Sequence, residues 1–150
     1  MKAGDVVEDF ELPDQDGTPR RLSEMLADGP VVLFFYPAAM TKGCTAEVCH
    51  FRDLVAEFTA VGAQTVGISA DDVSRQQEFA DRNGVGFPLL SDEDRTVAER
   101  FGVKRRIGPI PVKRHTFVIG ADQRVVEVIR SEVSMDAHAD RALEVLRSAG

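Results

Sequence analysis

The sequence has 150 residues, which is the length of one ordinary domain, and its 43% hydrophobic and 29% charged residues are typical of a soluble globular protein. Its formal net charge of −7 argues against a nucleic-acid-binding or anionic-membrane-binding surface, because either surface needs a clustered positive field. No apolar stretch with a small-residue cleavage site opens the chain, and the longest apolar run is too short to span a bilayer, so we expect a cytoplasmic protein.

The first part of the chain predicts a hairpin, two buried strands and a helix between those strands. Residues 10–12 and 18–22 form the expected hairpin, because a stretch that contains Pro, Asp and Gly separates them. Residues 31–36 and 63–69 are rich in apolar and β-branched side chains, which predicts strands buried on both faces of a sheet. A helix is expected over residues 43–58, where apolar residues recur at three- and four-residue spacing.

A second helix is expected after the second buried strand. Ser74 is placed to cap its N-terminus, with Gln77 in the capping-box position three residues later. Gly84 is placed to end it, so the predicted helix runs through residue 83. A shorter helix is expected over residues 94–101.

The last third of the chain predicts a loop, a hairpin and a helix. The loop covers residues 102–114, which contain two prolines. Residues 115–119 and 125–129 predict a β-hairpin, and residues 136–147 predict an amphipathic helix. Elements in this order predict an α/β protein with a mixed central sheet covered by helices on both faces. The order fits a single thioredoxin-like domain over residues 1–150, with the N-terminal hairpin added to it.

Two cysteines are the main candidates for chemistry, because cysteine pairs in a reducing cytosol tend to be catalytic or metal-binding. Val48 and Phe51 mark the apolar face of the predicted helix, and Cys44 lies four residues before Val48, in the first turn. Unpaired backbone N–H groups and the helix dipole favour a thiolate there, which is the nucleophilic form. The alternative interpretation is that Cys44 is a small buried hydrophobic residue.

The second cysteine, Cys49, lies five residues after Cys44 in the same predicted helix. Ideal helix geometry rotates the two side chains by about 140° and separates their Cα atoms by roughly 8–9 Å. A disulfide needs Cα atoms closer than about 7 Å, so the two thiols can bridge only if the first turns unwind. This spacing suits a redox cycle without establishing one.

The loop before the helix offers hydrogen-bond donors to a substrate. Reduction of a peroxide by a thiolate requires one oxygen to be positioned and the charge on the leaving oxygen to be stabilised. The hydroxyl of Thr41, three residues before Cys44, and the backbone N–H groups near Gly43 could provide this. An ordinary N-terminal turn residue is the alternative interpretation of Thr41.

Pro37, Thr41 and Cys44 match the Pro-x-x-x-Thr-x-x-Cys signature of peroxiredoxins at every defined position. With Cys49 five residues after Cys44, the chain resembles the PrxQ or bacterioferritin-comigratory-protein subgroup of that family. The similarity covers nearly the whole chain and includes residues 9–14, 87–92 and 114–119.

This resemblance implies a thiol peroxidase that needs no cofactor and no metal. Cys44 would attack hydrogen peroxide or an organic hydroperoxide, and Cys49 would then form an intramolecular disulfide with it after local unwinding of the helix. Arg114 would donate to the thiolate and the peroxide, and Glu47 would orient the hydrogen bonds of the site. Thioredoxin or a similar dithiol would reduce the disulfide, and the subgroup implies a monomer.

The chain departs from the subgroup at Lys42, where members typically carry proline. The change frees a backbone N–H and removes a rigid φ angle, which leaves the loop less pre-organised. A lysine close to the thiolate would instead favour its charged form. These two effects act in opposite directions on the rate.

A metal site is the first alternative to a peroxidase. Its candidate ligands are Cys44, Cys49, His50 and His115. Their spacing is poor for structural zinc, which usually shows two closely spaced ligand pairs. A dithiol oxidoreductase of the thioredoxin type would need Cys-x-x-Cys, and a Cys–His hydrolase would need a distinctive base, and the sequence shows neither. A non-enzymatic peroxide sensor would use the same cysteines, and turnover with a recycling reductant distinguishes the two.

Overall fold

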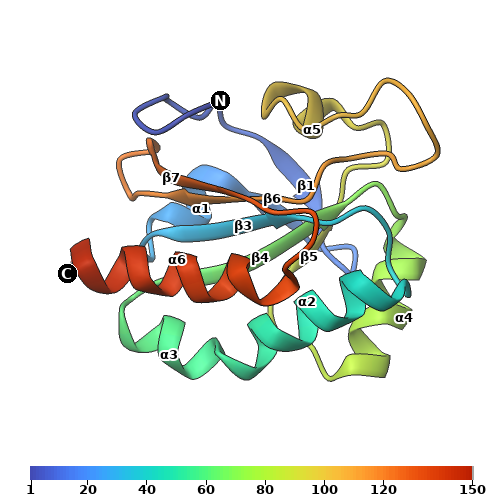
Figure 1. Cartoon of the computed structure of the whole chain (residues 1–150), viewed down its shortest axis with the longest axis horizontal. Helices are drawn as coiled ribbons and strands as arrows, with labels where there is room; N and C mark the ends of the chain where they lie inside the picture. Colours follow the sequence, from blue (N-terminus) through green and yellow to red (C-terminus); the bar gives the residue numbers. More distant parts are fainter. Residues whose placement is uncertain (150) are drawn as a thin grey trace.

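A five-stranded mixed sheet forms the centre of the computed structural model, which describes residues 1–149 (Figure 1). The strand order is β5-β4-β3-β6-β7. The strands are β3 (Val31–Phe35), β4 (Gln64–Ser69), β5 (Leu89–Ser91), β6 (His115–Ile119) and β7 (Val125–Arg130). The central strand β3 pairs in parallel with β4 and antiparallel with β6, which makes the sheet mixed, as the sequence predicts.

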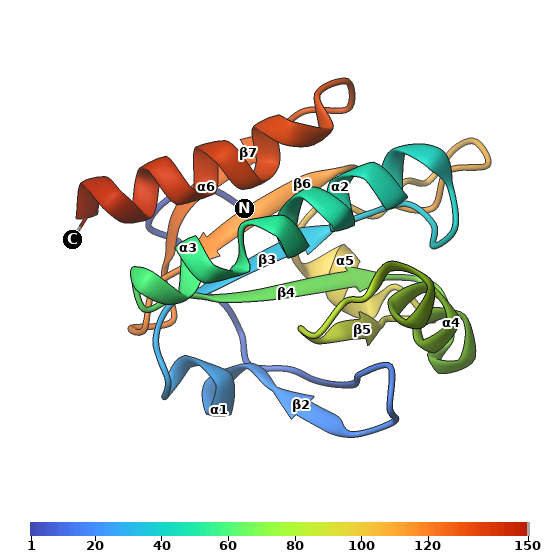
Figure 2. The same ribbon diagram turned by 90° about the horizontal axis from the view of Figure 1, so that it is seen from below.

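Helices cover both faces of this sheet. They are α1 (Leu22–Leu26), α2 (Lys42–Asp53), α3 (Val55–Ala60), α4 (Val73–Asn83), α5 (Thr96–Arg100) and α6 (Met135–Ala149). Figure 2 looks onto the face that α2, α3 and α6 cover, where α2 packs against α6. The helices α1 and α5 lie on the opposite face. None of the helices in the described residues is long and apolar enough to cross a membrane.

The continuous apolar run in β3 exists because both of its faces are buried. Val32 and Phe34 point into the core beneath α2, α4 and α6, where Phe34 stacks on Phe51 with 4.1 Å between ring centroids. Leu33 and Phe35 point into the second core, beneath α1 and α5. Alternate side chains of β3 therefore pack into two different cores. This confirms the prediction that helices cover both faces of the sheet.

The predicted N-terminal hairpin is present as a separate two-stranded antiparallel sheet of β1 (Glu11–Pro13) and β2 (Pro19–Arg21). Leu22, predicted to end the second strand, instead begins α1 and is fully buried. The short elements α1 and β5 were not predicted, because five and three residues are too few to show a periodicity.

Two predicted helix details were wrong. The helix expected over residues 43–58 is interrupted at Leu54, whose φ of −102° and ψ of 6° separate α2 from α3. Asp72 caps α4 instead of Ser74, because its extended backbone lets its carboxylate accept the Arg75 N–H at 2.8 Å. The predicted stop at Gly84 is confirmed, since this residue has the left-handed φ of 61° that glycine tolerates.

Candidate active site

Cys44 is the third residue of α2, and its side chain is fully buried in the core between α2 and the sheet. Thr41, the residue just before α2, has an extended backbone, and its carbonyl accepts the Thr45 N–H at 2.9 Å, which closes the first helical turn. The thiol therefore lies where α2 begins, beside backbone N–H groups that have no partner within the helix. This position favours a negative charge on sulfur.

Arg114 reaches this thiol from the start of β6, 70 residues further along the chain. Its Nη2 donates to Cys44 Sγ at 3.3 Å, and its Nη1 donates to Glu47 Oε1 at 2.6 Å. Its backbone N–H donates to Glu132 Oε2 at 2.8 Å. The side chain is only 9% exposed, so little water competes for the guanidinium. Three contacts hold this cation against the sulfur in one orientation.

Glu47 lies one turn after Cys44 on the same face of α2 and is fully buried. Its Oε1 accepts from Arg114, whereas its Oε2 has no hydrogen-bond partner and lies 3.7 Å from Nδ1 of His138, on α6. Burial raises the pKa of the Glu47 carboxyl to about 8, although the charge of Arg114 acts in the opposite direction. The sequence analysis assigned no role to His138. The four-residue spacing between His138 and Ala142 is the sequence signal that the His138 side chain lies on the buried face of α6.

The loop between β3 and α2 carries Pro37, Thr41 and Lys42. Pro37 directly follows the buried Tyr36 and is half-buried. The Thr41 hydroxyl is exposed and donates to the carbonyl of Ala38 at 2.8 Å, so in this conformation it bonds within the loop. Lys42 is exposed at the first position of α2, where proline is favoured and where the backbone N–H has no helical partner in either case. The backbone N–H that lysine adds at this position therefore gains no helical hydrogen bond.

Cys49 faces away from Cys44, toward the end of α4. Its thiol donates to Oδ1 of Asn83 at 3.5 Å, and Arg52 Nη1 donates to the Asn83 carbonyl at 2.6 Å. Cys49 is half-buried, and both cysteines are free thiols within one unbroken helix. The two sulfur atoms therefore cannot meet while α2 is intact.

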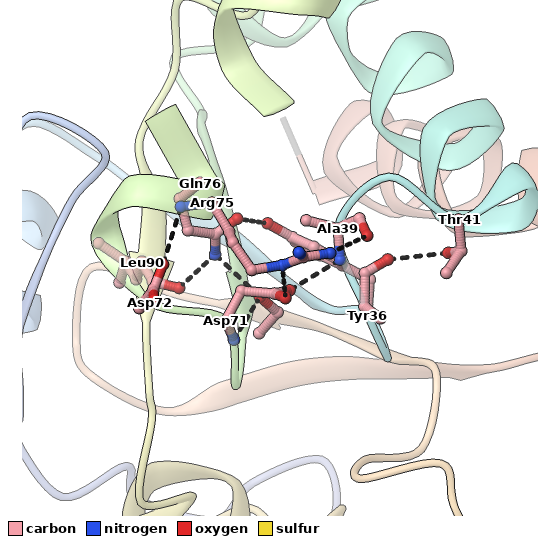
Figure 3. Close-up of polar contacts among 10 residues, drawn as sticks. Tyr36, Ala39, Thr41, Asp71, Asp72, Arg75, Gln76 and Leu90 are labelled. Carbon is pink, nitrogen blue, oxygen red and sulfur yellow. Dashed lines mark hydrogen bonds and ion pairs between the residues drawn. The ribbon is translucent and has the colours of Figure 1, made fainter. Parts of the chain in front are cut away.

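A polar network ties the loop before Cys44 to the neighbouring strand and helix (Figure 3). The Asp71 carboxylate accepts the Ala39 N–H at 2.7 Å and the Arg75 Nε–H at 3.1 Å, and Arg75 Nη2 donates back to the Ala39 carbonyl at 3.5 Å. Tyr36 donates to Gln76, which is anchored by donating to the Leu90 carbonyl at 2.8 Å. Tyr36 and Ala39, the two ends of this segment, are thus bonded to α4 and to Asp71 just before it.

Comparison with known proteins agrees with this geometry. A family model described as "AhpC/TSA family" matches residues 3–128 of the chain. The chain belongs to the AhpC/TSA family. It is a peroxiredoxin of the Bcp or PrxQ type, and peroxiredoxins are thiol peroxidases.

Three relatives illustrate how complete the peroxiredoxin similarity is. The crystal structure of peroxidoxin BcpB from Mycobacterium tuberculosis has 62% identity and a TM-score of 0.97, covering 100% of this chain and 99% of the other. Peroxiredoxin Bcp of Escherichia coli is 38% identical over 98% of this chain and 96% of its own length. A structure of the bacterioferritin comigratory protein of Xanthomonas campestris, described as reducing alkyl peroxides, has 32% identity and a TM-score of 0.85 over 93% and 91% of the two chains.

Three of the four candidate metal ligands of this peroxiredoxin have other polar contacts. Cys44 accepts from Arg114, Cys49 donates to Asn83, and a ring nitrogen of His50 lies 2.7 Å from Oδ1 of Asp140. Residues 1–149 contain no group of three or more His, Cys, Asp or Glu side chains placed to hold a metal ion.

The Asp71 network leads to a testable prediction for this peroxiredoxin. Asp71→Ala is expected to slow the reaction of the reduced enzyme with hydrogen peroxide by about tenfold, because a loop displaced by a fraction of an ångström misplaces the substrate. Stopped-flow measurement of the second-order rate constant checks this. Asp72→Ala is the matched control, since it removes the α4 cap at about 1 kcal/mol without touching the loop. Equal rates in the two variants would show that Asp71 does not position the site.

Proposed function

We propose that this chain reduces hydrogen peroxide and organic hydroperoxides, with Cys44 as the nucleophile and Cys49 as the resolving cysteine. The observation that carries the proposal is the buried Cys44 sulfur with Arg114 Nη2 at 3.3 Å, at the start of a helix. A cation and a helix N-terminus both favour the thiolate, and that is the reactive form of cysteine. The alkyl peroxide reduction of the Xanthomonas campestris relative supports the organic substrates.

In the first step the Cys44 thiolate attacks one peroxide oxygen and the O–O bond breaks. A Cys44 sulfenic acid forms, and water or an alcohol leaves with the remaining oxygen after taking up a proton. Arg114 carries two N–H groups directed to this region and is always charged, so it is suited to stabilise the developing negative charge on the leaving oxygen.

In the second step Cys49 condenses with the sulfenic acid, and one water molecule leaves as the disulfide forms. The first turns of α2 must unwind for this step, because both cysteines lie in one helix. Cys49 is held by a single sulfur hydrogen bond to Asn83, which is a weak restraint. Oxidation of Cys44 also removes the charged sulfur that Arg114 contacts, so the folded site is less stabilised at that point.

In the third step an external dithiol, with thioredoxin as the proposed partner, returns the enzyme to its reduced form. Its thiolate attacks the disulfide, a mixed disulfide forms, and its second thiol releases the reduced peroxiredoxin. Sustained turnover with such a reductant distinguishes an enzyme from a peroxide sensor that reacts once.

The test uses intact mass after one equivalent of hydrogen peroxide is added to the reduced protein. The wild type should become about two mass units lighter as two thiol hydrogens are lost. Cys49→Ser should still consume one equivalent but gain about 16 mass units as the sulfenic acid, and it should lose thioredoxin-linked turnover. Normal turnover in Cys49→Ser would show that this residue does not resolve the intermediate.

A further inference from the structure

His138 has two buried ring nitrogens with different partners. Its Nε2 lies 2.7 Å from the carbonyl oxygen of Ser131, and a carbonyl only accepts, so Nε2 carries a hydrogen. Its Nδ1 lies 2.8 Å from the Thr116 hydroxyl and 3.7 Å from Oε2 of Glu47. The nitrogen that faces Glu47 is therefore the one whose protonation is open to change.

Glu47 Oε2 is the buried atom that requires an explanation. It has no hydrogen-bond partner, although Glu47 and His138 are both fully buried. With Glu47 ionised and His138 neutral, this carboxylate oxygen would lie in the core without a donor, which is strongly unfavourable. A proton on either Oε2 or Nδ1 would leave the pair without net charge; the two atoms lie 3.7 Å apart, too far for a direct hydrogen bond, and Nδ1 already has the Thr116 hydroxyl at 2.8 Å.

We propose that Glu47 and His138 hold one exchangeable proton between them, and that His138 is a positioning residue that acts on Cys44 through Glu47 and Arg114. The kinetic part of this inference rests on the proposed peroxidase function. With the proton present, the pair has no net charge and Arg114 keeps its full positive field at Cys44. When the proton is lost, the pair becomes negative, and this charge, which Arg114 Nη1 already contacts at 2.6 Å, offsets part of the positive field that Arg114 presents to Cys44.

The charged or titratable groups that lie near the pair include Glu132, His115, Cys44 and Arg114. Glu132 accepts hydrogen bonds from the backbone N–H of Arg114 and from Arg105 Nη2, the latter at 2.6 Å. Burial lowers the pKa of His115 to about 4, so that ring is neutral. Arg114 contacts Glu47 through Nη1 and Cys44 through Nη2.

Burial supports the neutral form of both partners. It raises the pKa of Glu47 to about 8 and lowers the pKa of His138. The raised carboxyl pKa means that Glu47 keeps its proton below that value and loses it as the pH rises through about 8. The proton is accordingly held on Glu47, whose Oε2 lies 3.7 Å from Nδ1 of His138.

The first test observes the pair without any peroxide. Histidine labelled with ¹⁵N in the reduced wild-type protein should show His138 as the neutral Nε2–H tautomer, with an Nδ1 shift that moves between about pH 7 and 9. Glu47→Gln should abolish this movement, because glutamine does not titrate. His50 and His115 serve as internal references. An Nδ1 shift that stays constant, or that moves equally in Glu47→Gln, would overturn the shared proton whether or not the protein is a peroxidase.

The second test follows the first-turnover rate with hydrogen peroxide between pH 6 and 10. The wild type should lose about tenfold on the alkaline side, because the negative pair weakens, without removing, the donor that stabilises charge on the leaving oxygen. Glu47→Gln should remove this loss, and His138→Asn should move it to lower pH, since the amide can donate to ionised Glu47. His50→Asn, which removes a histidine on α2 that contacts Asp140, should keep the wild-type profile. The same alkaline loss in Glu47→Gln would overturn the role assigned to the pair.

Discussion

Replacing Cys44 by serine is expected to lower the rate of hydrogen peroxide reduction by at least about a thousandfold, because a serine hydroxyl is a far weaker nucleophile and does not ionise near neutral pH. The Cys44 sulfur is fully buried and accepts a hydrogen bond from Arg114 Nη2 at 3.3 Å. Peroxide consumption under single-turnover conditions measures the effect.

The control for this variant is Cys49→Ser, which should retain the first reduction. Circular dichroism and urea unfolding should show that Cys44→Ser is folded, since the substitution places a hydroxyl in a fully buried site beside Arg114. Substantial peroxide turnover by folded Cys44→Ser would refute the assignment of the nucleophile.

Replacing Arg114 by alanine is expected to cost about 10²–10³-fold in the rate with peroxide, which is the usual effect of removing one preorganised donor to a developing negative charge. The variant also leaves buried Glu47 without its donor, so the free energy of unfolding should fall by about 1–3 kcal/mol. Arg114→Lys should recover only part of the rate, because one ammonium group cannot reproduce the fork that contacts both Cys44 and Glu47.

Arg105→Ala is the matched control for Arg114. Arg105 also pairs with Glu132, through Nη2 at 2.6 Å, but it contacts neither Cys44 nor Glu47. Its loss should leave the rate within about twofold of wild type, as expected for a partly exposed ion pair. A loss in Arg105→Ala as large as that in Arg114→Ala would mean that the general positive field, and not the fork at the thiol, supports the reaction.

Several features of this protein follow from short stretches of sequence. Residues 31–36 predict a strand buried on both faces because every side chain in the run is apolar or aromatic. The apolar spacing of α2 places Cys44 in the first turn and facing the core, where the structure has it. Gly84 ends α4 because only a residue that tolerates a positive φ fits there. Each of these depends on contacts within a few residues, and such contacts leave a local pattern.

Other features were decided only by tertiary packing. Arg114 meets Cys44 because β6 lies beside β3, and no local pattern records which of the basic residues near position 114 this pairing brings to the thiol. His138 meets Glu47 because α6 packs against α2 on the same face of the sheet. Pro37, Thr41 and Cys44 share one loop and helix start, so sequence places them together, but the direction of the Thr41 hydroxyl depends on the fold around Ala38. Periodicity determines which face of an element is buried, whereas the partner on that face depends on the order and packing of elements distant in sequence.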